Sequence, residues 1–265
     1  MSVIVTGKNS FLGRALQAHE KTKGWTFLAH NEPLDVRRGD VIVNCAYHPD
    51  LTCQPYEASK DQDLRLASAF ADRVSLYVMI STRAVYPNEL LLDEETPLAP
   101  QGFYGEAKTE TEKRLSDILP EGKLLILRCS NIFGNEYGRK TFTGMCTTRL
   151  KDEGQIVFGL SPQTCKDFLP VEEFCSRLAD AVEARLTGIY NMGSGVATPC
   201  GKVAEALIRG YGKGELKVED QTIRGKFSLD ISKLSEALDL PQWHESDILE
   251  AFESVGRALN HYELN

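Results

Sequence analysis

The chain has 265 residues, of which 42% are hydrophobic and 26% charged, a composition typical of a globular protein with one large domain and room for an appendage. Its formal net charge is −8, and no stripe of lysine and arginine offsets that charge, which argues against a nucleic-acid partner. No apolar run is long enough to span a bilayer, so we expect no membrane segment, and we expect no signal peptide ahead of the strand-like start MSVIVTG.

The seven cysteines contain no C-x-x-C pair, and their odd number argues against a disulfide framework. The five histidines show no spacing typical of metal ligands, so we predict no metal site. Unpaired cysteines are typical of a reducing compartment, and we therefore expect a cytoplasmic protein.

In the first half of the chain, short apolar runs alternate with longer amphipathic ones. The runs predict strands at residues 3–6, 26–30, 41–46, 76–81 and 124–130, with helices near 11–20, 57–72 and 104–118. Strands that are apolar throughout are typical of a parallel sheet covered on both faces. The alternation therefore predicts an α/β protein with a doubly wound, Rossmann-type parallel sheet.

A glycine turn follows the first expected strand, in VIVTGKNSFLGRAL. Gly7 and Gly13 hold the first and third glycine positions of a dinucleotide-binding turn, where the backbone must turn tightly and the helix must pack close to the strand. Ser10 holds the middle position, where its hydroxyl could donate to a phosphate although its side chain narrows the approach. The helix N-terminus offers free N–H groups to a pyrophosphate. The turn predicts a cofactor site, while a plain strand-to-helix turn remains the alternative.

After residue 134 the alternation loosens into a helix near 142–152, a strand at 155–159, a strand end and helix within 167–186, a strand within 188–195 and further C-terminal helices. We expect residues 1–155 to form an NAD(P)-binding Rossmann core. Residues 156–265 should mainly form a small substrate-binding lobe, with segments near 165–193 returning to the core. Because ligands of open parallel sheets bind beyond the carboxyl ends of the strands, the lobe is expected to roof that crevice.

The second expected strand ends in LAHNEP, at a place where dinucleotide sites usually carry an acid that binds the ribose diol. Here the tip holds His30 and Asn31, and the first acid is Glu32. A neutral tip does not repel the 2′-phosphate of NADP(H). The choice between NAD and NADP therefore stays open.

Tyr104 and Lys108, in FYGEAK, are four residues apart and should lie on the same face of a helix. A free tyrosine has a pKa of about 10, and a neighbouring ammonium stabilises the tyrosinate. Tyr104 could then pass a proton to or from a carbonyl/hydroxyl pair while a nicotinamide exchanges hydride. The strand YVMISTRAVYP ends in hydroxyl residues that could donate to the reacting oxygen, Thr82 first and Ser81 second.

Seven motifs occur in one order along the chain: TGKNSFLG, NCA, STRAVYP, YGEAK, LRCSNIFG, KDFLPVEEF and GIYNMGSG. Together they resemble the extended short-chain dehydrogenase/reductase superfamily, and more narrowly its NAD-dependent epimerase/dehydratase family, which acts on nucleotide sugars. The likeness spans residues 3 to about 200. It implies NAD or NADP as the cofactor, a nucleotide-sugar substrate and a homodimer with the helices near 57–72 and 104–118 at its contact.

The resemblance also implies roles for individual residues. It makes Tyr104, Lys108 and Thr82 catalytic. Together with Asn31, from the end of the second expected strand, the residues expected at the cofactor are Gly7, Ser10, Phe11, Leu12, Gly13, Asn31, Asp35, Val36, Ala46, Tyr104 and Lys108. The residues expected at the substrate are Ser81, Thr82, Arg83, Asn131 and Lys166.

The sequence departs from the family pattern at two of these places. Lys166 replaces the arginine that is usual before DF, and Arg83-Ala84 replaces the Asp-Glu pair that follows the catalytic threonine in dehydratases. The second change argues against a 4,6-dehydratase, and the pattern fits a sugar 4-epimerase and a 4-ketoreductase equally well. A reductase of a non-sugar carbonyl compound and a non-catalytic dinucleotide-binding sensor stay open as alternatives.

Two charged segments complete the interpretation. Arg139 and Lys140, in GRKTF, could hold a nucleotide diphosphate. The run EASKDQD, residues 57–63, is interpreted as the solvated face of a helix.

Overall fold

The computed structural model describes residues 2–261 and is built around one six-stranded parallel sheet. In spatial order its strands are β2 (Thr26–Leu28), β1 (Val3–Thr6), β3 (Val41–Asn44), β4 (Leu76–Thr82), β5 (Leu124–Cys129) and β10 (Gly188–Met192). Each neighbouring pair is parallel. The predicted doubly wound α/β fold is therefore confirmed, and most expected strands begin at the predicted residue.

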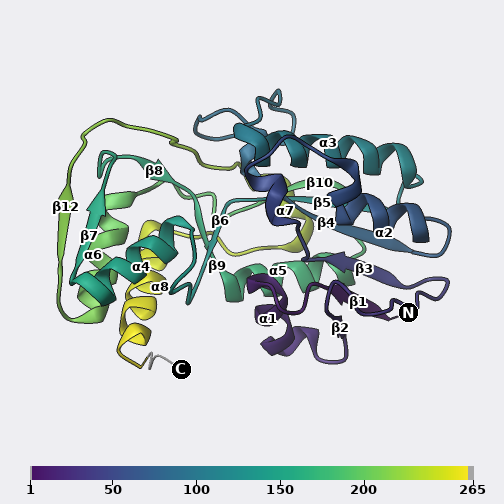
Figure 1. Ribbon diagram of the computed structural model, residues 1–265, viewed down its shortest axis with the longest axis horizontal. Coiled ribbons are helices and arrows are strands. Elements are labelled where there is room, and N and C mark those ends of the chain that lie inside the picture. The colour runs from purple at the N-terminus through teal and green to yellow at the C-terminus, as the bar shows by residue number, and fades with distance from the viewer. Residues whose placement is uncertain (1, 262–265) are drawn as a thin grey trace.

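Helices cover both faces of this sheet, as Figure 1 shows. On one face lie α1 (Phe11–Ala18) and α5 (Val171–Glu183), and on the other lie α2 (Gln62–Phe70) and α3 (Gly102–Ile118). Successive side chains of β4 pack on opposite faces of the sheet. Val78 packs in the hydrophobic cluster that contains α5, whereas Tyr77 packs in the cluster that contains α2 and α3. Burial on both faces explains why these strands are apolar throughout.

A smaller lobe packs beside the sheet around its own hydrophobic core. Its elements are α4 (Phe142–Glu153), β7 (Gln155–Phe158), α6 (Cys200–Tyr211), β12 (Glu215–Val218) and α8 (Glu245–Ala258). The strands β7 and β12 form a parallel pair, and the rings of Phe133 and Phe252 stack with centroids 3.8 Å apart. The lobe thus includes α4, which precedes residue 156, and β7, which begins at Gln155, whereas α5 and β10 lie in the core.

Short elements connect the core with the lobe. Two small sheets pair β6 (Asn131–Phe133) with β9 (Phe168–Pro170) and β8 (Cys165–Lys166) with β11 (Thr198–Pro199), and α7 (Ser232–Leu238) packs against β10. The 3₁₀ turns are η1 (Glu20–Thr22), η2 (Pro49–Thr52), η3 (Ala58–Lys60), η4 (Arg83–Val85) and η5 (Leu259–His261).

One buried carboxylate holds the returning C-terminal segment against the core. Asp167 accepts hydrogen bonds from the backbone N–H and the hydroxyl of Ser194 (both 2.9 Å), and from the backbone N–H groups of Gly195 (3.1 Å) and Leu229 (3.2 Å). Burial raises the pKa of Asp167, and these donors oppose the rise. The segment around residues 227–231 is thereby fixed beside the carboxyl end of the sheet.

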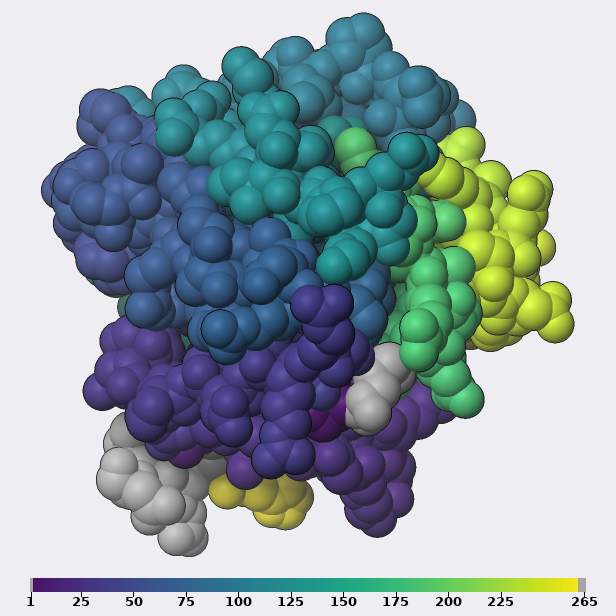
Figure 2. Space-filling view, turned by 90° about the vertical axis from the view of Figure 1, so that its right-hand side faces the viewer, coloured from purple at the N-terminus to yellow at the C-terminus, as the bar shows by residue number. Residues whose placement is uncertain are grey.

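The order of the strands places a crevice at the carboxyl ends of β1 and β3. The chain leaves β1 toward β2 on one side and later returns to form β3 on the other side, and in such sheets this switch point is where ligands bind. Figure 2 shows that the N-terminal half of the chain, purple to teal, makes up most of one face of the core, with later segments at its side.

Candidate active site

The glycine turn after β1 has no room for larger residues at its two glycines. Gly7 has φ +81°, and a Cβ there would lie 2.6 Å from the backbone nitrogen of Ala46. A Cβ on Gly13 would lie 2.2 Å from the carbonyl oxygen of Gly7. Ser10 caps α1, because its hydroxyl accepts the N–H of Gly13 at 3.0 Å. The first helical N–H groups, those of Phe11 and Leu12, have no acceptor within the helix and can meet an anion.

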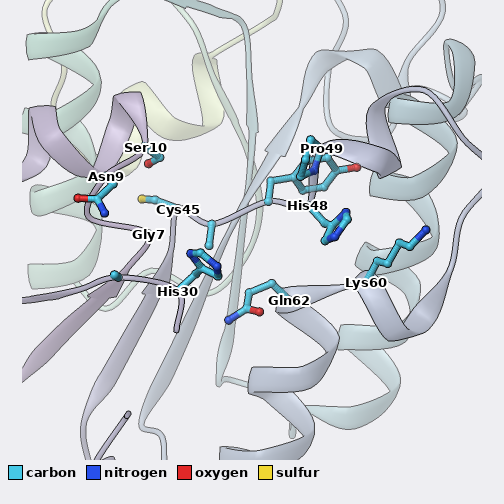
Figure 3. A pocket seen from close by; sticks show the side chains of 12 residues that line it. Gly7, Asn9, Ser10, His30, Cys45, His48, Pro49, Lys60 and Gln62 are labelled. Carbon is cyan, nitrogen blue, oxygen red and sulfur yellow. The ribbon is translucent and has the colours of Figure 1, made fainter. Parts of the chain in front are cut away.

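Two adjoining cavities lie over this turn. The first, about 330 Å³, is lined by Gly7, Asn9, Ser10, Ala29, His30, Cys45, Ala46, Tyr47, His48, Pro49, Lys60 and Gln62. In Figure 3 the glycine turn lies on one side of it and His48 and Gln62 on the other, with His30 between them. The second, about 580 Å³, is lined by Ser10, Phe11, Leu12, Asn44, Cys45, Ala46, Tyr47, Thr52, Ile80, Tyr104, Lys108, Arg139, Lys140 and Thr141. They share four lining residues and therefore form one continuous hollow.

The charge of this hollow contrasts with that of the whole chain. The formal net charge is −8, yet neither set of lining residues contains a carboxylate, and the second set contains Lys108, Arg139 and Lys140. A concave surface with cationic side chains and a helix N-terminus favours a phosphate-bearing ligand. The structure therefore brings Arg139 and Lys140 into the same hollow as the glycine turn.

Tyr104 and Lys108 both line the second cavity, one turn apart on α3. Lys108 is only 4% exposed, and its Nζ donates to the carbonyl oxygen of Ile80 at 2.7 Å. The Nζ also lies 3.7 Å from Oδ2 of Asp63 and 4.5 Å from the ring centroid of Tyr47. The ring of Tyr47 meets that of Tyr104 edge-on, with centroids 5.3 Å apart. The lysine is thus held in one position beside Tyr47, whose ring in turn contacts Tyr104.

The two hydroxyl residues at the end of β4 point to opposite faces of the sheet. Ser81 is buried and donates to Glu112, which also pairs with Arg128 at 2.8 Å. Its hydroxyl serves this buried network, contrary to the expectation that Ser81 contacts the substrate. Thr82 lies on the same face as Ile80, which lines the second cavity, and its Oγ1 accepts the N–H of Ala84 at 3.2 Å. Of the two, Thr82 is the one whose hydroxyl has no acidic acceptor.

Two residues of this site were missed by the sequence analysis. Tyr47 follows β3 and lines both cavities, and burial raises its pKa, with Tyr104 adding to the effect. Asp63 is 2% exposed and accepts the hydroxyl of Tyr77 at 2.9 Å. Burial raises the pKa of Asp63, while the charge of Lys108 opposes the rise.

The interpretation of residues 57–63 as a solvated face is therefore wrong for its last part. Asp61, 4% exposed, caps α2 by accepting the N–H of Leu64 at 3.0 Å and also accepts the hydroxyl of Thr111 at 2.7 Å. Asp63 lies beneath Lys108. An acid at the first turn of an expected helix was the only available signal, since acids favour N-caps and first turns.

The other predicted cofactor residues lie at different places. Ala46 lines both cavities, and Asn31 lines a neighbouring cavity of about 310 Å³ with His30 and Gln62. Asp35 is exposed, and neither it nor Val36 lines any of these three cavities. Val36 is 3% exposed and packs into the core beside α2, because its side chain is apolar and faces the sheet. Its side chain therefore belongs to the core, and the expected role of Val36 at the cofactor stays a prediction.

The remaining predicted substrate residues lie where the lobe meets the core. Asn131 begins β6 directly after β5, and its backbone N–H donates to the carbonyl oxygen of Asp167 at 3.2 Å. The guanidinium carbon of Arg83 lies 4.3 Å from the ring centroid of Phe227, and Nζ of Lys166 lies 5.8 Å from the same centroid. Arg83 and Lys166, separated by more than eighty positions in sequence, thus meet at one aromatic ring.

Within residues 2–261, no helix combines the length and apolar character that a bilayer span requires. In that same part of the chain, no group of three or more His, Cys, Asp or Glu side chains is arranged to hold a metal ion. All seven cysteines are free thiols.

Known structures share this fold over nearly the whole chain. A UDP-N-acetylglucosamine 4-epimerase from Methanobrevibacter ruminantium, in complex with UDP-N-acetylmuramic acid, superposes with a TM-score of 0.80 at 17% identity, covering 98% of both chains. A UDP-glucuronic acid 4-epimerase from Bacillus cereus with NAD gives 0.77 at 18% identity, covering 98% and 99%. The protein RMD from Pseudomonas aeruginosa with NADPH gives 0.76 at 19% identity, covering 97% and 99%.

Sequence comparison adds a relative and a family. The low-salt glycan biosynthesis protein Agl12 of Haloferax volcanii is 26% identical over 234 residues, which are 82% of this chain and 75% of that protein. The family described as RmlD substrate binding domain matches residues 1–159, more than half of the chain. The chain therefore belongs to the RmlD substrate binding domain family.

Proposed function

We propose that this protein is an NAD(P)-dependent enzyme that transfers hydride at a keto or hydroxyl carbon of a nucleotide-activated sugar, as a 4-epimerase or a 4-ketoreductase. The observation that carries the proposal is the shared hollow: Tyr104 and Lys108 line the same cavity as Ser10, Phe11 and Leu12 of the glycine turn. A proton-transfer group and a pyrophosphate-binding turn are thus parts of one site, as hydride transfer with coupled proton transfer requires.

The residues of the hollow fit a nicotinamide dinucleotide. The close approach of Gly7 to Ala46 and of Gly13 to Gly7 keeps the turn tight, and the N–H groups of Phe11 and Leu12 can receive the pyrophosphate. Ser10 leaves this N-terminus open, since its hydroxyl is directed to the N–H of Gly13. When bound, the nicotinamide would supply or accept the hydride. The absence of carboxylates among the lining residues suits both NAD and NADP.

In this proposal Tyr104 gives a proton to, or takes one from, the oxygen of the reacting carbon through its phenolic oxygen. Lys108 carries a positive charge beside it, and that charge is held in place by Ile80 and Asp63. A phenol within reach of the reacting oxygen can serve as the general acid or base of this step. Thr82, at the end of β4, would donate its hydroxyl to the same substrate oxygen.

A nucleotide-activated sugar is supported by two observations. The second cavity has Arg139 and Lys140 on its lobe side, where a diphosphate would find positive charge. Two of the structurally similar proteins are described as 4-epimerases of UDP-sugars, and one of them holds UDP-N-acetylmuramic acid. We also propose a homodimer, with α2 and α3 at its contact, and a cytoplasmic location, which the free cysteines favour.

The test is turnover and binding with a panel of nucleotide sugars. Purified protein is assayed for bound nicotinamide by absorbance and fluorescence, and then for melting-temperature shifts with UDP-, GDP- and dTDP-sugars in the presence of NAD or NADPH. A ligand that binds only the folded state raises the melting temperature. We expect a response to at least one nucleotide sugar, followed by epimerisation or by NAD(P)H oxidation with its 4-keto form. A response only to non-sugar carbonyl compounds, or cofactor binding with no turnover of any substrate, would contradict the proposal.

A further inference from the structure

The segment between β6 and α4 meets the start of α1 at the hollow. Arg139 and Lys140, in this segment, line the second cavity together with the glycine-turn residues Ser10, Phe11 and Leu12. The guanidinium carbon of Arg139 lies 4.2 Å from the ring centroid of Phe11, the first residue of α1. A cation from later in the chain is thus brought beside the first residue of the helix whose N-terminus can receive a pyrophosphate.

The backbone of this later segment is closely packed on two sides. The N–H of Arg139 donates to the carbonyl oxygen of Glu136 at 2.9 Å, which closes a tight turn. A Cβ on Gly144, in the first turn of α4, would lie 2.4 Å from the carbonyl oxygen of Arg139. A Cβ on Gly134 would lie 3.4 Å from Cζ of Phe11. The segment is therefore held between α4 and Phe11, and the backbone of Arg139 has a fixed position.

A buried carboxylate fixes one end of the guanidinium. Glu136 is 2% exposed and accepts Nη1 of Arg139 at 2.8 Å and the hydroxyl of Thr141 at 3.0 Å. Burial raises the pKa of Glu136, and the charge of Arg139 opposes the rise. A guanidinium has five N–H donors, and in the described part of the chain Glu136 accepts the one hydrogen bond that Arg139 donates from its side chain. Other donors of Arg139 are therefore available to a ligand in the cavity.

Two ligands of the proposed function carry a diphosphate, namely the dinucleotide cofactor and the nucleotide sugar. The position of Arg139 favours the cofactor, because its guanidinium lies against Phe11, whose backbone N–H is one of those expected to meet the cofactor's pyrophosphate. Lys140, the next residue, is exposed and stays available for the diphosphate of the sugar. The two neighbouring cations are thereby assigned to different ligands.

We propose that Arg139 binds the pyrophosphate of the dinucleotide and thereby slows the release of the cofactor. The inference rests on the cofactor site of the proposed function and adds to it a residue from the segment before α4. A guanidinium can make two parallel hydrogen bonds to phosphate oxygens, and its charge strengthens both. The pyrophosphate is then enclosed between the N-terminus of α1 and Arg139. Because the contact must break before the cofactor leaves, its loss should raise the dissociation rate.

The experiment measures how fast the cofactor leaves the folded protein. Protein loaded with NADH, or with NADPH where that binds more tightly, is mixed in a stopped-flow instrument with an excess of the oxidised cofactor. The change in fluorescence gives the dissociation rate. We expect R139Q to release the cofactor about tenfold faster or more, because charge-assisted hydrogen bonds are the strong ones. R257Q is the matched control: it removes an exposed arginine of α8 that pairs with Glu253 at 2.8 Å, and it should release the cofactor at the unaltered rate.

Three further measurements identify what Arg139 contacts. R139Q should weaken the binding of ADP-ribose, which has the pyrophosphate but no nicotinamide, by the same factor as that of NADH in titration calorimetry. The affinity of the cofactor-loaded protein for UDP and GDP should stay unchanged in R139Q. F11L removes the ring that positions the guanidinium, so it should also speed release, and the double variant F11L/R139Q should be no faster than R139Q alone.

Different outcomes identify which idea fails. Release by R139Q at the unaltered rate, or an equal acceleration in K140Q, would overturn the contact assigned to Arg139 and leave the proposed function intact. Weaker binding of UDP or GDP by R139Q with unchanged cofactor release would assign Arg139 to the diphosphate of the sugar instead. Failure of the unaltered protein to bind NADH, NADPH or ADP-ribose would overturn the proposed function, and the inference with it.

Circular dichroism melts confirm that folded protein is compared. Where R139Q does not fold, R139K takes its place, because it keeps a positive charge for Glu136 and loses only the planar fork. R139K should still release the cofactor several times faster than the unaltered protein, and an unaltered rate in R139K would then overturn the inference.

Discussion

Replacing Asp63 by asparagine should expose how strongly the site depends on one buried charge. Asp63→Asn keeps the shape of the side chain and an oxygen acceptor for the hydroxyl of Tyr77, which lies 2.9 Å away. It removes the negative charge 3.7 Å from Nζ of Lys108, and the two side chains are only 3% and 5% exposed. At an effective dielectric constant of about 20, two unit charges at that distance attract by about 4 kcal/mol.

The net loss of stability comes from the positive charge of Lys108, which stays buried in the variant. Lys108 keeps the carbonyl oxygen of Ile80 as a partner, but its buried positive charge is no longer balanced. Breaking a buried pair in this way typically costs about 3–5 kcal/mol in the free energy of unfolding.

The assay is urea denaturation of the unaltered protein and the variant at pH 7. Asp180→Asn provides the matched control, since Asp180 forms a surface pair with Lys21 at 2.7 Å in which the side chains are 32% and 47% exposed. Surface pairs contribute about 0–1 kcal/mol. If Asp63→Asn costs no more than Asp180→Asn, the assigned role of the Asp63–Lys108 pair is wrong.

Three further predictions concern the turn, the hydroxyl donor and the cysteines. Gly13→Ala should weaken NAD(P)H binding by more than about tenfold, measured by fluorescence titration, because its Cβ would lie 2.2 Å from the carbonyl oxygen of Gly7; unchanged affinity would contradict the tight turn. Thr82→Val should lower kcat by about 100-fold with little change in cofactor affinity, and activity near that of the unaltered protein would remove the threonine from the mechanism. In native protein, iodoacetamide should label exposed Cys53 first, whereas Cys129 should react only after unfolding, because burial raises its pKa to about 12. The labelled positions are identified by mass spectrometry of peptides, and early labelling of Cys129 would contradict its burial.

Local sequence patterns predict the sheet and its helices because each pattern reflects one dominant force. The run VIVT has four apolar residues in succession, and a strand buried on both faces needs all four. The pair Tyr104 and Lys108 follows from the 3.6-residue period of the helix, and the structure places both in one cavity. These features depend on residues that are close in sequence.

The parts of the site that sequence patterns miss depend on contacts between distant segments. Asp63 lies in a run of charged residues, and only the approach of Lys108 from α3 makes its burial tolerable. Ser81 and Thr82 are both hydroxyl residues at the end of one strand, and successive side chains of a strand point to opposite faces of the sheet. Ser81 points to the face where it donates to Glu112. Likewise, the meeting of Arg83 and Lys166 at Phe227 joins three separate stretches of the chain.

Substitution of the proposed proton donor tests the central claim most directly. Tyr104→Phe keeps the ring that contacts Tyr47 and removes only the hydroxyl. Tyr47→Phe is the comparison: the hydroxyl of Tyr47 donates to the carbonyl oxygen of Leu51 at 3.3 Å, and burial raises its pKa, so it is unsuited to proton exchange. Turnover of the nucleotide sugar found in the panel is measured for both variants, together with NAD(P)H affinity. We expect Tyr104→Phe to lose turnover while it still binds cofactor, and Tyr47→Phe to keep most of its turnover. Turnover retained by Tyr104→Phe would contradict the account.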